Sequence, residues 1–185
     1  MNIVAFDEAA ERLQHGEIGV IPTDTVYGVV ACAANQSATK RLYELKKREH
    51  KPGTLIAANI GQLIDLGVSE SEINKVKQWW PNPVSAILAV QGHEYLHQGV
   101  GSLAMRVIAD AKVRKLLDQT GPLITSSANQ PGQPPATTIQ EALDYFGDTV
   151  DFYVDGGTIS DIQPSTIIRP TDQGIEVLRQ GSVSL

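Results

Sequence analysis

Apolar and polar positions at the start of the chain change from a helical to a strand period. Ala9, Ala10 and Leu13 recur on one face, which predicts a helix. Asp7 stands where an N-cap is expected. The alternation over residues 18–20, just before a proline, predicts a strand.

Four further helices are predicted where a polar N-cap residue precedes apolar residues at helical spacing. Two of them open on capping boxes, S-E-S-E and T-I-Q-E, in which a hydroxyl and a glutamate satisfy free backbone donors. The predicted starts and apolar faces are Ser37 with Ala38, Leu42 and Leu45; Ser69 with Ile73, Val76 and Trp80; Asp110 with Val113, Leu116 and Leu117; and Thr138, whose helix ends near Gly147.

Seven more strands are expected, and they gather toward the C-terminus. They cover residues 54–58, 84–90, 102–107, 122–125, 152–154, 165–169 and 176–179. Helices and strands interleave without an internal repeat or a long linker, which indicates one α/β domain over residues 1–185. We expect a twisted mixed sheet with helices packed on it.

Composition narrows the class of protein. Of the 185 residues, 42% are hydrophobic and 19% charged, which is typical of a globular domain. The longest apolar stretch, 26–34, is shorter than the ~20 residues of a membrane span. The N-terminus has no basic region of a signal peptide, so we expect a cytoplasmic protein. A single cysteine, Cys32, excludes a disulfide framework and a multi-cysteine zinc site.

Charge is unevenly distributed. The chain carries a net charge of −6, which disfavours a general nucleic-acid binder. Residues 40–51, KRLYELKKREHK, nevertheless hold six Lys or Arg and two Glu. Such a basic island indicates either a local anion site or a solvated helix face.

Two short motifs match known signatures without their structural context. Residues 93–97, HEYLH, fit the zinc-protease pattern, which needs a helix to direct both imidazoles at one metal. We expect a surface loop between Gly92 and Gly99, and no tightly bound metal. Residues 99–104, GVGSLA, imitate a dinucleotide fingerprint but lead into a predicted strand, whereas the fingerprint opens a helix.

Four segments combine small hydroxyls or amides with proline or glycine at predicted strand ends. They are PTDTVYG (22–28), TSSAN (125–129), PSTI (164–167) and RQG (179–181). Such residues favour turns, but strand ends on an open sheet are also where ligands bind. Together with Lys46 and Arg48 they predict a polar, basic site.

These segments and others resemble the YrdC-like threonylcarbamoyl-AMP synthase family, in its short single-domain form. The likeness rests on PTDTVYG, LKKR (45–48), WPNPVS (80–85), SLAMRV (102–107), SSAN (126–129), DGG (155–157), PSTI and LRQG (178–181), in family order over nearly the whole chain. The resemblance implies a sheet curved around a concave basic cavity.

The resemblance also implies an activity. The enzyme would be a nucleotidyltransferase that makes L-threonylcarbamoyl-AMP and pyrophosphate from L-threonine, bicarbonate and ATP, with Mg²⁺ accompanying ATP. The product would serve a downstream threonylcarbamoyl-transferase complex in the t6A modification of tRNA next to the anticodon. Direct contact with tRNA is a further possible interaction, and no membrane is implied.

Carried over by position, the resemblance implies three groups of site residues. The catalytic group is Lys46, Arg48, Ser127 and Asn129; the threonine group is Thr25, Tyr27, Arg106, Thr125 and Ser165; and the ATP group is Arg48, Ser102, Ser127, Pro135 and Arg179. Guanidinium groups suit phosphate oxygens, and Arg106 suits a carboxylate. No histidine or acidic dyad stands out as a general base, which favours a proximity mechanism.

Some alternatives stay open. Arg106 alternates with apolar residues and would also fit a paired structural arginine. Glu49 stands where many family members have proline, which leaves the nucleotide contacts of residues 49–54 undefined. A non-catalytic module that binds tRNA or ribosomal RNA is the first rival function, and affinity for its RNA would fall steeply with salt. A carbamoyl-adenylate-forming domain and a zinc protease are further rivals.

Overall fold

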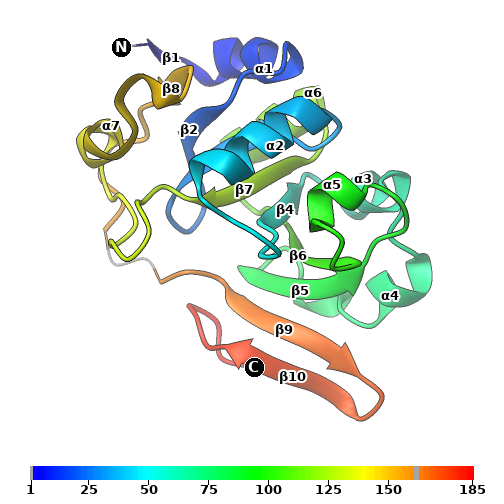
Figure 1. Cartoon of the computed structure of the whole chain (residues 1–185). Coiled ribbons are helices and arrows are strands. Elements are labelled where there is room, and N and C mark those ends of the chain that lie inside the picture. Colours follow the sequence, from blue (N-terminus) through cyan, green and yellow to red (C-terminus); the bar gives the residue numbers. More distant parts are fainter. Residues whose placement is uncertain (1, 161–162) are drawn as a thin grey trace.

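The computed structural model describes residues 2–160 and 163–185, and their strands form a ten-stranded sheet (Figure 1). The order across the sheet is β1-β8-β2-β3-β7-β4-β6-β5-β9-β10. The strands are β1 (Ile3–Val4), β2 (Gly19–Pro22), β3 (Tyr27–Cys32), β4 (Thr54–Ala57), β5 (Val84–Ala89), β6 (Ser102–Val107), β7 (Leu123–Ser127), β8 (Phe152–Val154), β9 (Thr166–Thr171) and β10 (Gly174–Arg179).

The sheet is mixed, as the sequence predicts. Strand β8 lies parallel to β1 and β2, and β4 lies parallel to β6, whereas β3 pairs antiparallel with both β2 and β7. The helices are α1 (Phe6–Gln14), α2 (Gln36–Leu45), α3 (Ile60–Asp65), α4 (Glu70–Asn74), α5 (Glu94–His97), α6 (Ala111–Thr120) and α7 (Ile139–Phe146), with 3₁₀ turns η1 (Lys77–Trp79) and η2 (Gly147–Thr149).

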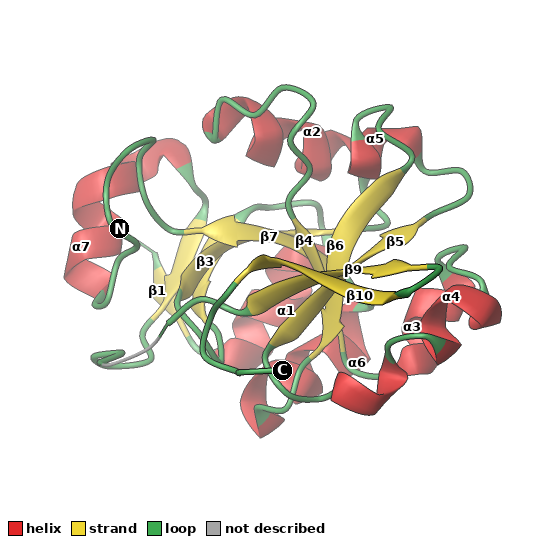
Figure 2. Ribbon diagram, turned by 90° about the horizontal axis from the view of Figure 1, so that it is seen from below, coloured by secondary structure: helices red, strands yellow, loops and turns green. Residues whose placement is uncertain are grey.

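Helices cover both faces of the sheet (Figure 2). Helices α1 and α6 pack side by side on one face, and α2, α5 and α7 lie on the other. Strand β3 shows why both layers are needed. Its Tyr27, Val29 and Ala31 belong to the core beneath α2, while Val30 and Cys32 belong to the core beneath α1 and α6. Within the described ranges, no helix is long and apolar enough to cross a membrane.

The capped helix starts are largely where the sequence places them. Ser69, Asp110 and Thr138 each accept a hydrogen bond from the backbone N–H three residues on, so these three predictions are confirmed. The first two caps differ. Ala5 precedes α1 without a side-chain cap, while Asp7 accepts from Lys115; and Asn35, rather than Ser37, caps α2.

Other differences have physical causes. Strand β3 is not predicted because it is buried on both faces and therefore lacks an apolar–polar alternation. Strand β1 and helix α3 are too short to give a clear period. The helix expected to reach Trp80 ends at Asn74, and a 3₁₀ turn follows. The loop expected over residues 93–97 contains one helical turn, α5.

Candidate functional site

The polar strand-end segments come together at a concave pocket of about 200 Å³. Eight of the site residues expected from the sequence line it: Thr25, Arg48, Arg106, Thr125, Ser127, Pro135, Ser165 and Arg179. Three guanidinium groups and no carboxylate are among its described lining residues, so the expected basic cavity is present. A second cavity of about 590 Å³ adjoins it at Thr25, Pro135 and Pro164.

The loop between β2 and β3 is folded by the hydroxyl of Thr23. This oxygen accepts from the backbone N–H groups of Thr25 and Val26, both at 3.2 Å, and donates to the Val26 carbonyl at 2.6 Å. Such side-chain bonds replace the ladder bonds that the turn lacks. The loop therefore holds Asp24 and Thr25 in fixed positions beside the pocket.

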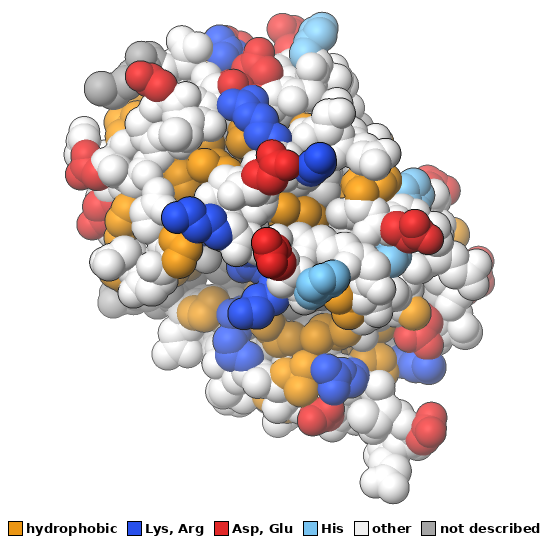
Figure 3. All heavy atoms as spheres, in the orientation of Figure 1, with side chains coloured by type: hydrophobic (Ala, Val, Ile, Leu, Met, Phe, Trp, Pro, Cys, Tyr) orange, Lys and Arg blue, Asp and Glu red, His pale blue; other side chains and the backbone are white. Residues whose placement is uncertain are grey.

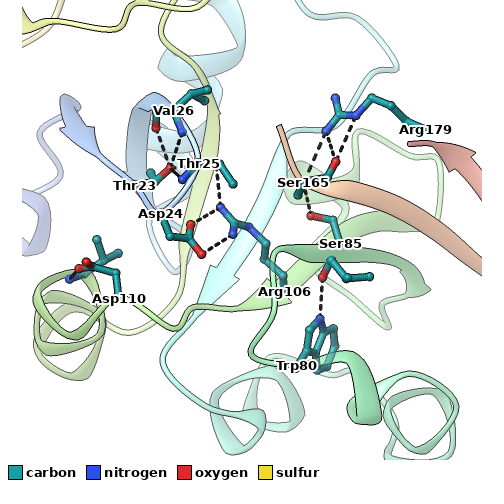
Figure 4. Close-up of polar contacts among 12 residues, drawn as sticks. Thr23, Asp24, Thr25, Val26, Trp80, Ser85, Arg106, Asp110, Ser165 and Arg179 are labelled. Carbon is teal, nitrogen blue, oxygen red and sulfur yellow. Dashed lines mark hydrogen bonds and ion pairs between the residues drawn. The ribbon is translucent and has the colours of Figure 1, made fainter. Parts of the chain in front are cut away.

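Arg106 projects from β6 and is only 3% exposed (Figure 4). Its Nη1 donates to Asp24 Oδ2 at 2.7 Å, and its Nη2 donates to Thr25 Oγ1 at 3.1 Å. A buried guanidinium without such partners would be strongly destabilising. Arg106 is thus a paired arginine, as one alternative proposed, and it also lines the pocket.

Ser165 and Arg179 form the opposite wall. The Arg179 Nη2 donates to the Ser165 carbonyl at 2.8 Å, which ties the end of β10 to the start of β9. Burial, and secondly the charge of Arg106, lower the pKa of Arg179. The Ser165 hydroxyl lies 2.9 Å from that of Ser85, a fully buried residue of β5. Ser165 is therefore held from both neighbouring strands, through its hydroxyl by β5 and through its carbonyl by β10.

Lys46 lies behind the pocket and binds the loop after β7. Its Nζ donates to the carbonyl oxygens of Ser127, at 2.8 Å, and Asn129, and to Asn129 Oδ1 at 3.1 Å. Ser127 Oγ in turn donates to Asn129 Oδ1 at 2.7 Å. Burial, followed by the charge of Arg48, lowers the pKa of Lys46 to about 8. Three members of the expected tetrad, Lys46, Ser127 and Asn129, are thus joined. Lys46 and Asn129 support Ser127 from behind and do not line the pocket as expected catalytic residues would.

Arg48 reaches the pocket from the segment after α2. Its Nη1 donates to the carbonyl oxygens of Lys51 and Pro52, each at 3.1 Å, so the guanidinium is held by its own loop. Burial lowers the pKa of Arg48 from the ordinary arginine value. A positive charge is thereby placed at the pocket wall with part of its hydrogen-bonding fork still available for a ligand.

Two expected site residues lie elsewhere. Tyr27 does not line the pocket: its buried hydroxyl accepts from Gly156 N and donates to the Gly157 carbonyl, both at 2.8 Å. It holds the DGG segment against the β2–β3 loop. Ser102 is half-buried at the start of β6, opposite Ala89, and is not among the lining residues.

The structure adds residues that the sequence reasoning passed over. Thr23, Thr54 and Ser126 line the pocket, and Asp24 and Ser85 support it. Thr23, Asp24 and Ser126 stand within the strand-end segments PTDTVYG and TSSAN. Their position beside a strand end was therefore the signal that could have identified them as site residues. Thr54 opens β4, and nothing in its sequence surroundings marks it.

The basic island of residues 40–51 does not form one surface. Lys40 pairs with Glu44 at 3.8 Å in solvent, and Arg41 pairs with Asp151 at 2.6 Å. Lys46 is buried, and Arg48 lines the pocket. Figure 3 shows Lys and Arg side chains interspersed with Asp and Glu on this face. The island is therefore part anion site and part solvated helix.

The HEYLH segment has a structural explanation. His97 is buried, accepts from Gly101 N at 3.0 Å through Nδ1, and donates through Nε2 to the Gly92 carbonyl at 3.1 Å. Both ring nitrogens are thereby used. Across residues 2–160 and 163–185, no group of three or more His, Cys, Asp or Glu side chains is arranged to hold a metal ion.

Known proteins resemble this chain in sequence and structure. The family model Sua5/YciO/YrdC, described as telomere recombination, matches residues 11–181. A threonylcarbamoyl-AMP synthase from Idiomarina loihiensis is 34% identical over 176 residues, covering 91% of this chain and 95% of that protein. One from Enterobacter sp. strain 638 is 36% identical over 168 residues, covering 86% and 88%.

A solved structure shares the fold closely. The structure of P. abyssi Sua5 complexed with L-threonine superposes with a TM-score of 0.86 at 28% identity. The match covers 96% of this chain and 54% of that one, so this chain spans about half the length of the P. abyssi protein. Because the family model and the curated relatives cover most of the sequence, this chain belongs to the Sua5/YciO/YrdC family.

Proposed function

We propose that this chain is a threonylcarbamoyl-AMP synthase. It joins L-threonine, bicarbonate and ATP into L-threonylcarbamoyl-AMP, pyrophosphate and water. The observation that carries the proposal is a single pocket in which three guanidinium groups face a set of hydroxyls. The guanidinium groups suit the phosphates of ATP and the carboxylate of an amino acid, and the hydroxyls suit a small polar substrate. The curated names of the bacterial relatives support the same activity.

The threonine half of the site is proposed around Arg106. Its guanidinium takes the substrate carboxylate, while Thr25, Thr125 and Ser165 offer hydroxyls to the amino and hydroxyl groups. The Ser85–Ser165 contact restricts the Ser165 hydroxyl to few orientations. Tyr27 contributes by holding the loop rather than by touching the substrate.

The nucleotide half is proposed around Arg48, Ser127 and Arg179. Pro135 lines both cavities, so the adjoining space offers room for the adenosine. Mg²⁺ enters as part of the substrate, bound to the oxygens of the triphosphate. We assign Ser102 no contact, since it lies off the lining.

The chemistry needs two bond-forming steps. Bicarbonate takes up a proton and loses water to give carbon dioxide. The threonine amine attacks the carbon of carbon dioxide and releases a proton, which leaves a carbamate. A carbamate oxygen then attacks the α-phosphorus of ATP, and the bond to pyrophosphate breaks. Negative charge grows on the phosphoryl oxygens and the leaving group, where Arg48 and Arg179 stabilise it. Holding the reactants together supplies the remaining rate enhancement.

The proposed setting follows from the product. An adenylate of this kind is an activated donor, so a downstream threonylcarbamoyl transferase acting on tRNA is the proposed partner. A cytoplasmic location is proposed because ATP and tRNA occur together there. The mixed charges around Lys40 and Arg41 do not favour a separate RNA-binding function.

Pyrophosphate release tests the proposal. Purified protein with ATP should release pyrophosphate only when L-threonine and bicarbonate are both present, and degassed bicarbonate-free buffer serves as the control. Release that is independent of threonine would contradict the proposed function.

A further inference from the structure

The Asp24 carboxylate lies against the Arg106 guanidinium, beside the pocket that Arg106 lines (Figure 4). Asp24 Oδ2 is 2.7 Å from Nη1, and Oδ1 is 2.7 Å from Nη2. The Asp24 side chain is 13% exposed and the Arg106 side chain 4%, so little water screens the attraction between the two charges. The hydrogen bond from Nη1 to Asp24 and the one from Nη2 to Thr25 Oγ1 together fix the plane of the guanidinium as well as its position.

The ion pair joins distant parts of the sheet. Asp24 belongs to the loop after β2, and Arg106 belongs to β6, with β3, β7 and β4 between these two strands in the sheet order. The contact therefore reaches across the concave side that holds the pocket. The Thr23 hydroxyl keeps the Asp24 end of this bridge in place through its bonds to the following backbone.

A count of donors shows what remains for a ligand. A guanidinium has five N–H groups. Asp24 Oδ2 accepts one from Nη1, and Thr25 Oγ1 accepts one from Nη2, whereas Asp24 Oδ1 lies 2.7 Å from Nη2 without accepting a hydrogen bond from a described residue. In the contacts between described residues, Nε–H and one N–H on each terminal nitrogen are left over, and Arg106 lines the pocket.

We propose that Asp24 is a positioning residue for substrate recognition, an inference that rests on the proposed function. It holds the Arg106 fork so that the remaining N–H groups meet the carboxylate of the amino-acid substrate. Its negative charge also offsets that of the buried guanidinium, which lets Arg106 keep its place while the site is empty. Asp24 acts through Arg106 and does not touch the reacting atoms.

The test measures binding of L-threonine by isothermal titration calorimetry, with turnover measured separately. Asp24→Asn keeps the shape and removes the charge, and should weaken threonine binding by about 10- to 100-fold. The KM for ATP, and kcat at saturating threonine, should change by less than about threefold, because the proposed nucleotide half is intact. Asp24→Glu should recover part of the lost affinity.

Two controls separate positioning from general stability. Asp110→Ala removes another carboxylate, the cap of α6, whose Oδ1 accepts from Val113 N at 2.9 Å. This variant should melt at a lower temperature yet bind threonine like the wild type. L-Threoninamide lacks the carboxylate, so wild type and Asp24→Asn should bind it with equal affinity. If Asp24→Asn does not fold, the Asp24→Glu variant carries the same comparison.

The outcomes are distinguishable. Unchanged or tighter threonine binding by a folded Asp24→Asn would overturn the positioning role, and tighter binding would identify Asp24 as a competitor for Arg106. An equal loss of affinity for threonine and threoninamide would also overturn it. A wild-type protein that does not bind threonine would refute the proposed function and this inference with it.

Discussion

At the scale of single residues, the pocket combines short hydroxyl side chains, fixed close to the backbone, with long cationic side chains tethered at their ends. Arg48 is held by the carbonyls of its own loop, and Arg106 by Asp24. Tethering lowers the conformational entropy that these side chains would lose on meeting a ligand. A pocket built this way is organised before the substrate arrives.

Arg48 should matter far more to catalysis than its neighbour Lys40. Arg48→Ala removes a cation from the pocket wall and should lower threonine-dependent pyrophosphate release by about 30- to 1000-fold, or ~2–4 kcal/mol. Arg48→Lys should recover little, because an ammonium lacks the planar fork. Lys40→Ala, which loses only an exposed pair with Glu44, should remain near wild type. Equal losses in both variants would refute the assignment of Arg48.

Lys46 should titrate well below the ordinary lysine range. Burial lowers its pKa to about 8 in the folded protein, against 10.5 for the free side chain. Between these values the unfolded chain holds a proton that the folded chain lacks, so the contribution of Lys46 to the free energy of unfolding rises with pH.

The measurement is a pH titration of ¹³C-labelled lysine side chains by NMR, with Lys46→Arg used to assign the signal. A midpoint near 8 is expected for the Lys46 signal. A Lys46 midpoint near 10.5 would show that burial does not set its protonation.

Sequence reasoning located residue types better than partners. The hydroxyls at strand ends were recognisable, and eight expected residues line the pocket. The Asp24–Arg106 pair was not predictable, because the two residues are 82 positions apart and meet only when the sheet curves. For the same reason the sequence does not predict that the Tyr27 hydroxyl binds Gly157, 130 positions away, instead of lining the pocket.

At the scale of elements, the paired strands β3 and β7 contribute adjacent lining residues to the pocket. Gly28 stands opposite Ser127 in this pairing. A Cβ atom at Gly28 would come within 2.6 Å of Thr125 Oγ1, closer than real contacts allow. The absence of a side chain at Gly28 therefore leaves the Thr125 hydroxyl in place.

Gly28→Ala should displace that hydroxyl and raise the KM for threonine by about 10-fold, at a cost of ~1–3 kcal/mol in stability. Gly19→Ala in the adjacent strand β2 is the matched control, because its Cβ would meet the Phe152 ring at 2.3 Å, away from the pocket lining. The control should lose stability without a change in KM. Steady-state kinetics and thermal unfolding of both variants decide between these effects, and parallel changes in KM would contradict the assigned role of Gly28.

The elements themselves were predictable wherever a cap or a period marked them. Ser69, Asp110 and Thr138 start their helices as expected, since a side-chain acceptor at the N-cap is a local property. Strand β3 lacked any period because both its faces are buried, which is a property of the whole sheet. The brief α5 turn depends on tertiary bonds of His97.

At the scale of the whole molecule, the mixed sheet brings four distant segments to one concave side. The β2–β3 loop, the end of β7, the start of β9 and the end of β10 all contribute to the pocket. Helices cover the two faces of the sheet (Figure 2), so the polar residues at the strand ends are left for binding. The fold thereby offers one place in which an anionic nucleotide and a small amino acid can meet.

The most direct measurement of that claim is product identification by mass spectrometry. The protein is incubated with ATP, ¹³C-bicarbonate and either L-threonine or L-valine, which has a similar shape but no hydroxyl. The account predicts L-threonylcarbamoyl-AMP carrying the isotope label, and valine product lower by up to about 10⁴-fold, because the site hydroxyls would be left unpaired. A product without the label, or equal amounts from valine and threonine, would contradict it.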